Sequence, residues 1–223
     1  MDTQTALNLL NEHKEKFDAY YKLLAEWNEK INLTAITQYD EVFVKHFEDS
    51  LYGADLIPNN AALCDVGSGA GFPGIPLNIV RSDVNVTLID SLNKRINFLQ
   101  TVAEELNLNI NCIHIRAEDA GRSTMRESFD VVCARAVARL NTLCEYCLPL
   151  VKVGGVFLAY KSVADEEVKE SQNAIKLLGG RIEEVKKFNL SNGDGRSIVV
   201  IKKISATPQK YPRGKGKERS LPL

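Results

Sequence analysis

The apolar positions of the first 57 residues recur with the spacing of amphipathic helices. The first thirty residues predict one such helix, and residues 42–51 predict a second. Pro58 and the pair Asn59-Asn60 then interrupt the pattern, which indicates a boundary near residue 58. We therefore expect residues 1–57 to form a helical extension in front of a larger domain.

After this boundary, short apolar runs alternate with helical patterns. The expected strands are 61–66, 84–90, 110–115, 129–134 and 154–160. Helical patterns occupy 92–106, 140–151 and 165–178. Strands that alternate with helices predict a parallel sheet covered by helices on both faces.

The end of this region departs from the alternation. Residues 181–190 and 197–204 read as two strands, joined by the turn sequence Asn192-Gly193-Asp194-Gly195. We therefore expect residues 58–204 to form an α/β domain with a Rossmann-like sheet. Its seven strands should be mostly parallel and should end in an antiparallel hairpin.

Composition narrows the class of protein. The chain has 223 residues, of which 44% are hydrophobic, and no apolar run reaches the roughly 20 residues of a membrane helix. The N-terminus lacks the pattern of a signal peptide, so we expect a cytoplasmic protein. Its five cysteines are scattered through apolar stretches and should pack in the core. The lone Cys144-x-x-Cys147 pair has no partner pair, and we expect no metal site.

Positive charge gathers at the C-terminal end. Residues 202–223 contain seven lysines and arginines and one acid, Glu218, whereas the net charge of the whole chain is −1. A basic segment that also contains prolines and glycines can follow a phosphate backbone. A disordered, solubilising terminus is the alternative. We expect residues 205–223 to be a flexible tail.

A glycine-rich run, Asp65–Gly74, lies between the first expected strand and a segment that can open a helix. Glycines at such a turn let the backbone approach a ligand closely. They stand at alternate positions, Gly67, Gly69 and Gly71. A dinucleotide-binding turn reads G-x-G-x-x-G, and here Phe72 stands where its third glycine would be.

Two prolines in and after this run weaken a phosphate-binding interpretation. Pro73 and Pro76 lack the backbone N–H groups that would donate hydrogen bonds to a pyrophosphate at a helix N-terminus. The run also lacks the lysine and hydroxyl residue of a P-loop. These features favour S-adenosylmethionine over NAD or ATP.

Three later strand ends would meet this loop at the carboxyl edge of the sheet, where open α/β folds bind ligands. Asp90 ends the second expected strand and could accept hydrogen bonds from both ribose hydroxyls; capping of helix 92–106 is the alternative. Ala117 and Glu118 follow the third strand, near the expected adenine edge. Arg135 ends the fourth strand.

These segments resemble the RsmG (GidB) family of bacterial methyltransferases. The resemblance covers nearly the whole chain and rests on Asp65–Pro76, Asp90–Arg95, Ala117-Glu118, Arg135–Ala138, Asn32–Thr34, His46–Leu51 and Lys210–Arg213. It implies the class I S-adenosylmethionine-dependent methyltransferase fold. It also implies methylation of N7 of a guanine in small-subunit (16S) rRNA. By the same resemblance, Gly67, Phe72, Ala117, Glu118 and Arg135 contact the methyl donor.

Guanine N7 carries a free lone pair, so methyl transfer there needs positioning and electrostatics more than a general base. Arg135 and Lys161 are candidates for positioning the substrate. Arg139 is a candidate RNA contact, and a solvated surface role is open for both Arg139 and Lys161. His46 and Asp49 lie one helical turn apart, and we favour capping or packing over substrate contact for them.

The expected partner is 16S rRNA or the small ribosomal subunit. In the tail, the candidate RNA contacts are Lys210, Arg213 and Lys215. The modest size of the chain favours a monomer. Two other functions stay open: methylation of another RNA, a protein or a small molecule, and RNA binding without catalysis.

Overall fold

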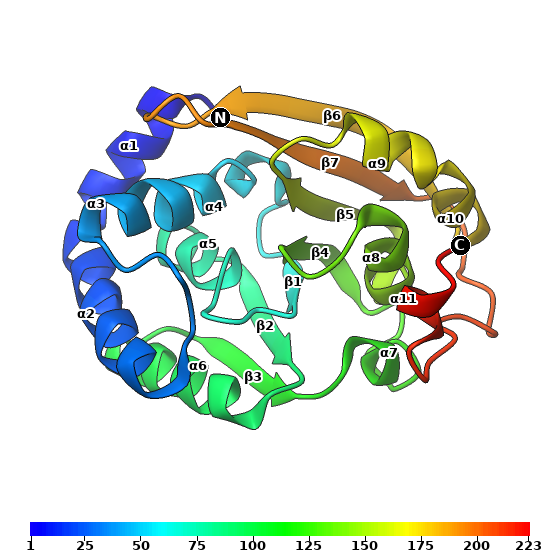
Figure 1. Ribbon diagram of the computed structural model, residues 1–223, viewed down its shortest axis with the longest axis horizontal. Coiled ribbons are helices and arrows are strands. Elements are labelled where there is room, and N and C mark those ends of the chain that lie inside the picture. The colour runs from blue at the N-terminus through cyan, green and yellow to red at the C-terminus, as the bar shows by residue number, and fades with distance from the viewer.

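A computed structural model describes all 223 residues, and its centre is a seven-stranded sheet (Figure 1). The strand order is β3-β2-β1-β4-β5-β7-β6. The strands are β1 (Ala62–Val66), β2 (Asn85–Asp90), β3 (Ile110–His114), β4 (Phe129–Arg135), β5 (Val151–Lys161), β6 (Gly180–Asn189) and β7 (Gly195–Lys203). The first five strands pair in parallel, and β7 pairs antiparallel with both β5 and β6. The predicted mostly parallel sheet with a C-terminal hairpin is confirmed.

Helices cover both faces of the sheet. One layer contains α1 (Thr3–Glu12), α2 (Lys14–Ile31), α3 (Tyr39–Val42), α4 (Asp49–Leu51), α5 (Gly74–Val80) and α6 (Asn93–Glu105). The other contains α7 (Ala117–Ala120), α8 (Leu140–Cys147), α9 (Asp165–Glu170), α10 (Gln172–Leu177) and α11 (Lys217–Ser220). The two layers appear on opposite sides of the sheet in Figure 1.

The central strands alternate between two hydrophobic cores because successive side chains of a strand point to opposite faces. In β4, Val131 and Cys133 pack in the core shared with the N-terminal helices. Val132 and Ala134 pack in the core shared with α8. Both faces of the sheet are therefore buried, as expected for parallel strands covered by helices.

Several helices differ from the predicted ones. The first thirty residues form two helices, which are interrupted at His13, where φ is −111°. Residues 39–51 are helical, but Phe43–Glu48 forms a wider π-helical turn. The helix predicted over 140–151 ends at Cys147, and the one predicted over 165–178 is interrupted at Ser171.

The C-terminal tail packs against the protein, which differs from the flexible tail expected from its composition. It lies beside α7 and α8, as the red segment of Figure 1 shows. The Tyr211 ring is buried, and Arg213 forms an ion pair with Glu145 at 2.7 Å. The Glu145 side chain is only 1% exposed. The tail therefore supplies the partner that this buried carboxylate needs.

A buried lysine fixes the start of the tail. The Lys203 ammonium donates to the Leu148 carbonyl and the Thr207 hydroxyl and lies 3.1 Å from Glu127. Burial lowers the pKa of Lys203 to about 8. One of the seven basic residues counted over 202–223 is thus buried inside the fold.

The cysteines lie mostly inside the fold. All five cysteines are free, and Cys64, Cys133, Cys144 and Cys147 are buried. No group of three or more metal-ligating side chains is placed to hold a metal ion. None of the helices has the length and apolar character that crossing a membrane requires.

Candidate active site

The glycine-rich loop connects β1 to α5 with backbone angles that favour glycine. Gly67 has φ +69°, and a Cβ added there would lie 2.8 Å from a methyl group of Val137. Gly71 has φ +95°, and its added Cβ would lie 2.5 Å from both the Tyr20 hydroxyl and Ile75. The loop is therefore packed tightly between the segment after β4 on one side and α2 and α5 on the other, and larger residues at these two positions would displace it.

A buried carboxylate joins the two ends of this loop. Asp65 accepts a hydrogen bond from the Gly74 N–H at 3.0 Å, and its other oxygen has no partner. Burial raises the pKa of Asp65 to about 7, although the bond from Gly74 opposes the shift. Asp65 thus holds the loop closed from inside the protein.

Asp90 fixes the middle of the loop from the end of β2. Its Oδ2 accepts from the Gly69 N–H at 3.0 Å, and its Oδ1 accepts from the Leu92 N–H at 2.9 Å. Arg95 makes a longer contact of 3.4 Å with Oδ2. The carboxylate therefore orders the backbone before α6 and still has acceptor capacity for a ligand.

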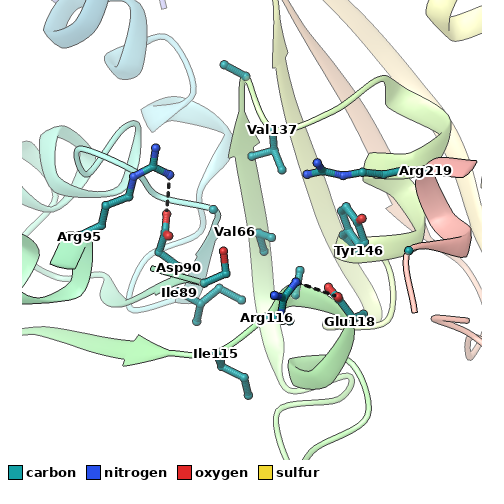
Figure 2. Close-up of a pocket in the computed structure, with 15 residues that line it drawn as sticks. Val66, Ile89, Asp90, Arg95, Ile115, Arg116, Glu118, Val137, Tyr146 and Arg219 are labelled. Carbon is teal, nitrogen blue, oxygen red and sulfur yellow. Dashed lines mark hydrogen bonds and ion pairs between the residues drawn. The ribbon is translucent and has the colours of Figure 1, made fainter. Parts of the chain in front are cut away.

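A cavity of about 400 Å³ opens beside Asp90 at the carboxyl edge of the sheet. It is lined by Val66, Gly67, Ile89, Asp90, Ser91, Arg95, Ile115, Arg116, Ala117, Glu118, Ala136, Val137, Tyr146, Gly216 and Arg219. Figure 2 shows side chains from β2, the β3–α7 connection, α8 and α11 around this space. Polar groups at its rim and apolar side chains on its walls fit a nucleoside-like ligand.

The structure brings four of the predicted donor-binding residues to this cavity: Gly67, Asp90, Ala117 and Glu118. Gly69 contributes through its hydrogen bond to Asp90. Gly71, Phe72 and Arg135 are not among the lining residues. Gly71 and Phe72 belong to the loop but face the N-terminal helices, and Arg135 is directed toward the same helices.

Phe72 and Arg135 belong to a cluster that joins β4 to the N-terminal helices. The Arg135 guanidinium pairs with Asp49 at 2.7 Å and lies 4.9 Å from the centre of the Phe72 ring. The His46 ring stacks on Phe72, with their centres 4.5 Å apart, and bonds to the Thr34 hydroxyl. Burial and the nearby Arg135 charge lower the pKa of His46 to about 3. His46 thus packs on Phe72, and Asp49 forms an ion pair with Arg135.

Lys161 holds the loop that forms one wall of the cavity. Its ammonium donates to the Ala138 carbonyl and pairs with Glu167, both at 2.8 Å, and only 10% of its side chain is exposed. Ala136 and Val137 of this loop line the cavity. Arg139 follows the loop, is exposed and pairs with Glu170. Lys161 therefore positions the wall and does not face the cavity itself.

The candidate RNA contacts of the tail have different surroundings. Lys210 and Lys215 are exposed, and Lys210 lies over the Tyr211 ring. The carboxylate of Glu145 accepts hydrogen bonds from both the backbone and the guanidinium of Arg213. Lys210 and Lys215 are thus free to meet a phosphate, whereas Arg213 is engaged in packing.

Sequence reasoning missed five polar residues of the cavity: Ser91, Arg95, Arg116, Tyr146 and Arg219. Arg95 and Arg116 adjoin predicted sites, and their place beside Asp90 and Glu118 could have indicated them. Tyr146 lies on α8, and Arg219 reaches the cavity because the tail folds onto that helix. No local pattern distinguishes Arg219 from the other basic residues of the tail.

This chain has the fold of the class I methyltransferases, and its cavity lies at the carboxyl edge of the sheet, where open α/β folds bind ligands. The structure is similar to TrmN from Thermus thermophilus, with a TM-score of 0.54 and 17% identity over 71% of this chain and 48% of that one. It is also similar to TYW2 from M. jannaschii in complex with AdoMet. There the TM-score is 0.56, with 17% identity over 70% of this chain and 74% of that one. At such low identity, the likeness concerns the fold.

The family follows from the sequence comparisons. The model of the GidB family, rRNA small subunit methyltransferase G, matches residues 13–198. Ribosomal RNA small subunit methyltransferase G of Bacillus velezensis is 48% identical, over 99% of this chain and 95% of its own length. The protein of the same name from Staphylococcus carnosus is 50% identical, over 97% and 93%. This chain therefore belongs to the rRNA small subunit methyltransferase G family, as the resemblance implied.

Proposed function

We propose that this protein transfers a methyl group from S-adenosylmethionine to N7 of a guanine in 16S rRNA. The observation that supports this proposal most directly is the cavity beside Asp90 and Gly67 at the carboxyl edge of the sheet. The chain that forms this cavity belongs to the rRNA small subunit methyltransferase G family. We further propose that it acts as a monomer in the cytoplasm, where its proposed ribosomal RNA substrate is found.

The lining residues would hold the three parts of the donor at different places in the cavity. The Asp90 carboxylate, which makes only a long contact of 3.4 Å with Arg95, would accept hydrogen bonds from the ribose hydroxyls. Ala117 and Glu118, at the start of α7, would hold the adenine. Gly67 and Val137 would hold the methionine part, with the Gly67 backbone and the Val137 side chain as the wall of the cavity there.

The protein acts mainly by positioning the two reactants. S-adenosylmethionine supplies a methyl group on a sulfonium, and its departure leaves a neutral thioether. Guanine N7 offers its lone pair without losing a proton, so no side chain has to act as a base. Lys161 and Arg135 are positioning residues: Lys161 fixes the wall at Ala138, and Arg135 fixes the end of β4 against Asp49.

The RNA meets the protein through exposed basic side chains. Lys210 and Lys215 stand exposed on the tail, and Lys215 directly precedes the cavity-lining residue Gly216. Contacts of this kind bind phosphates without reading sequence and weaken as salt rises. Arg139 joins them when it leaves Glu170. The choice of guanine then depends on the shape of the RNA around it.

Labelled S-adenosylmethionine tests this proposal. We expect the purified protein to transfer label to small ribosomal subunits or 16S rRNA taken from a strain that lacks its gene. Subunits from a strain that retains the gene are the control and should accept little label, because their site is already methylated. Transfer only to a protein, a metabolite or another RNA would assign a different methyltransferase activity. No transfer to any of them would favour RNA binding without catalysis.

A further inference from the structure

The three arginines that line the cavity differ in their charge partners. Arg95 lies 3.4 Å from Asp90, and Arg116 lies 3.9 Å from Glu118, so each faces a carboxylate of the same cavity. Arg219 has no such ion pair. Its guanidinium is therefore the one positive charge on the cavity lining that no carboxylate of the protein offsets, and it favours an anionic group of a ligand.

The fold holds Arg219 in place. Its neighbour Glu218 is fully buried, and the Glu218 side chain accepts a hydrogen bond from the Gly214 N–H. The backbone carbonyl of Glu218 accepts a hydrogen bond from the Thr142 hydroxyl at 2.8 Å. The ion pair between Arg213 and Glu145 secures the chain just before this turn. In Figure 2 the Arg219 side chain extends from α11 toward Val137. The guanidinium is thus presented to the cavity by a packed segment.

The position of Arg219 corresponds to the methionine end of the donor. Asp90 marks the ribose, and Ala117 marks the adenine, which leaves the space near Gly67 and Val137 for the amino-acid part. The only anionic group of S-adenosylmethionine is the α-carboxylate at that end. A guanidinium matches the two oxygens of a carboxylate. Resting on the proposed function, we propose that Arg219 binds the α-carboxylate of the donor.

Two ligands that differ in this carboxylate provide the test. S-adenosylhomocysteine carries the amino-acid group, whereas 5′-methylthioadenosine keeps the nucleoside and sulfur and lacks it. We expect Arg219→Ala to weaken S-adenosylhomocysteine binding by about tenfold or more and to leave methylthioadenosine binding within about twofold. Arg219→Lys should retain part of the affinity. Lys217→Ala, which removes a charge from the same helix outside the cavity, should change neither affinity.

Isothermal titration calorimetry separates the outcomes. Equal losses for both ligands would overturn the proposal, because they would indicate a general collapse of the cavity. Unchanged affinities for both, with weaker binding of 16S rRNA and a smaller salt dependence, would assign Arg219 to an RNA phosphate and also overturn it. If the unaltered protein bound neither S-adenosylmethionine nor S-adenosylhomocysteine, that result would overturn the proposed function itself, and the role of Arg219 with it.

Discussion

Asp90→Ala is expected to weaken S-adenosylmethionine binding by about 100-fold or more. A hydrogen bond to a charged group contributes about 1.5–3 kcal/mol, and the variant loses two such bonds to the ribose. It also loses the bond that holds the Gly69 N–H, so the loop under the donor is released. Asp90→Asn retains one acceptor oxygen and should give an intermediate affinity. Isothermal titration calorimetry measures the dissociation constants.

Asp119→Ala is the matched control for this experiment. Asp119 is an exposed acid on α7 that does not line the cavity, so its removal makes the same change in charge. We expect its affinity for the donor to stay within about twofold of the unaltered protein. An Asp90→Ala protein that is folded and binds the donor as tightly as this control would rule out the ribose contact.

Asp49→Ala should lower the free energy of unfolding by about 3–5 kcal/mol, because it leaves the Arg135 guanidinium buried without its partner. The two side chains are only 7% and 12% exposed and lie 2.7 Å apart. Arg135 retains its contact with the Phe72 ring, but an aromatic face offsets little of a buried charge. Urea denaturation measures the loss.

Two further variants isolate the cause. Glu26→Ala breaks the pair between Glu26 and Lys30, whose side chains are both 62% exposed, and should cost less than about 0.5 kcal/mol. The double variant Asp49→Ala/Arg135→Met removes both buried charges and should be more stable than Asp49→Ala alone. A loss for Asp49→Ala no larger than that for Glu26→Ala would contradict the role of this pair.

The sequence was most informative where local pattern and topology agree. The strands β1 to β4 lie within one residue of their predicted ends, because buried parallel strands are marked by short apolar runs. Strand topology then places Gly67, Asp90 and Ala117 at one edge of the sheet. The central part of the candidate site was therefore predictable from order along the chain.

Contacts between distant segments could not be predicted in the same way. The tail composition indicates flexibility, and only the buried Glu145 in α8 explains why Arg213 packs there. The pairing of Arg135 with Asp49 joins residues 86 positions apart. The break at His13 lacks any glycine or proline signal. Each of these features depends on tertiary partners that no local pattern contains.

Nucleoside analysis of the methylated RNA tests the central claim most directly. Small ribosomal subunits from a strain without the gene are incubated with labelled S-adenosylmethionine and either the unaltered protein or Asp90→Ala. Their 16S rRNA is then digested and separated by liquid chromatography and mass spectrometry. We predict label in 7-methylguanosine with the unaltered protein and a strongly reduced amount with Asp90→Ala. Label in any other nucleoside, or equal 7-methylguanosine with both proteins, would contradict the account.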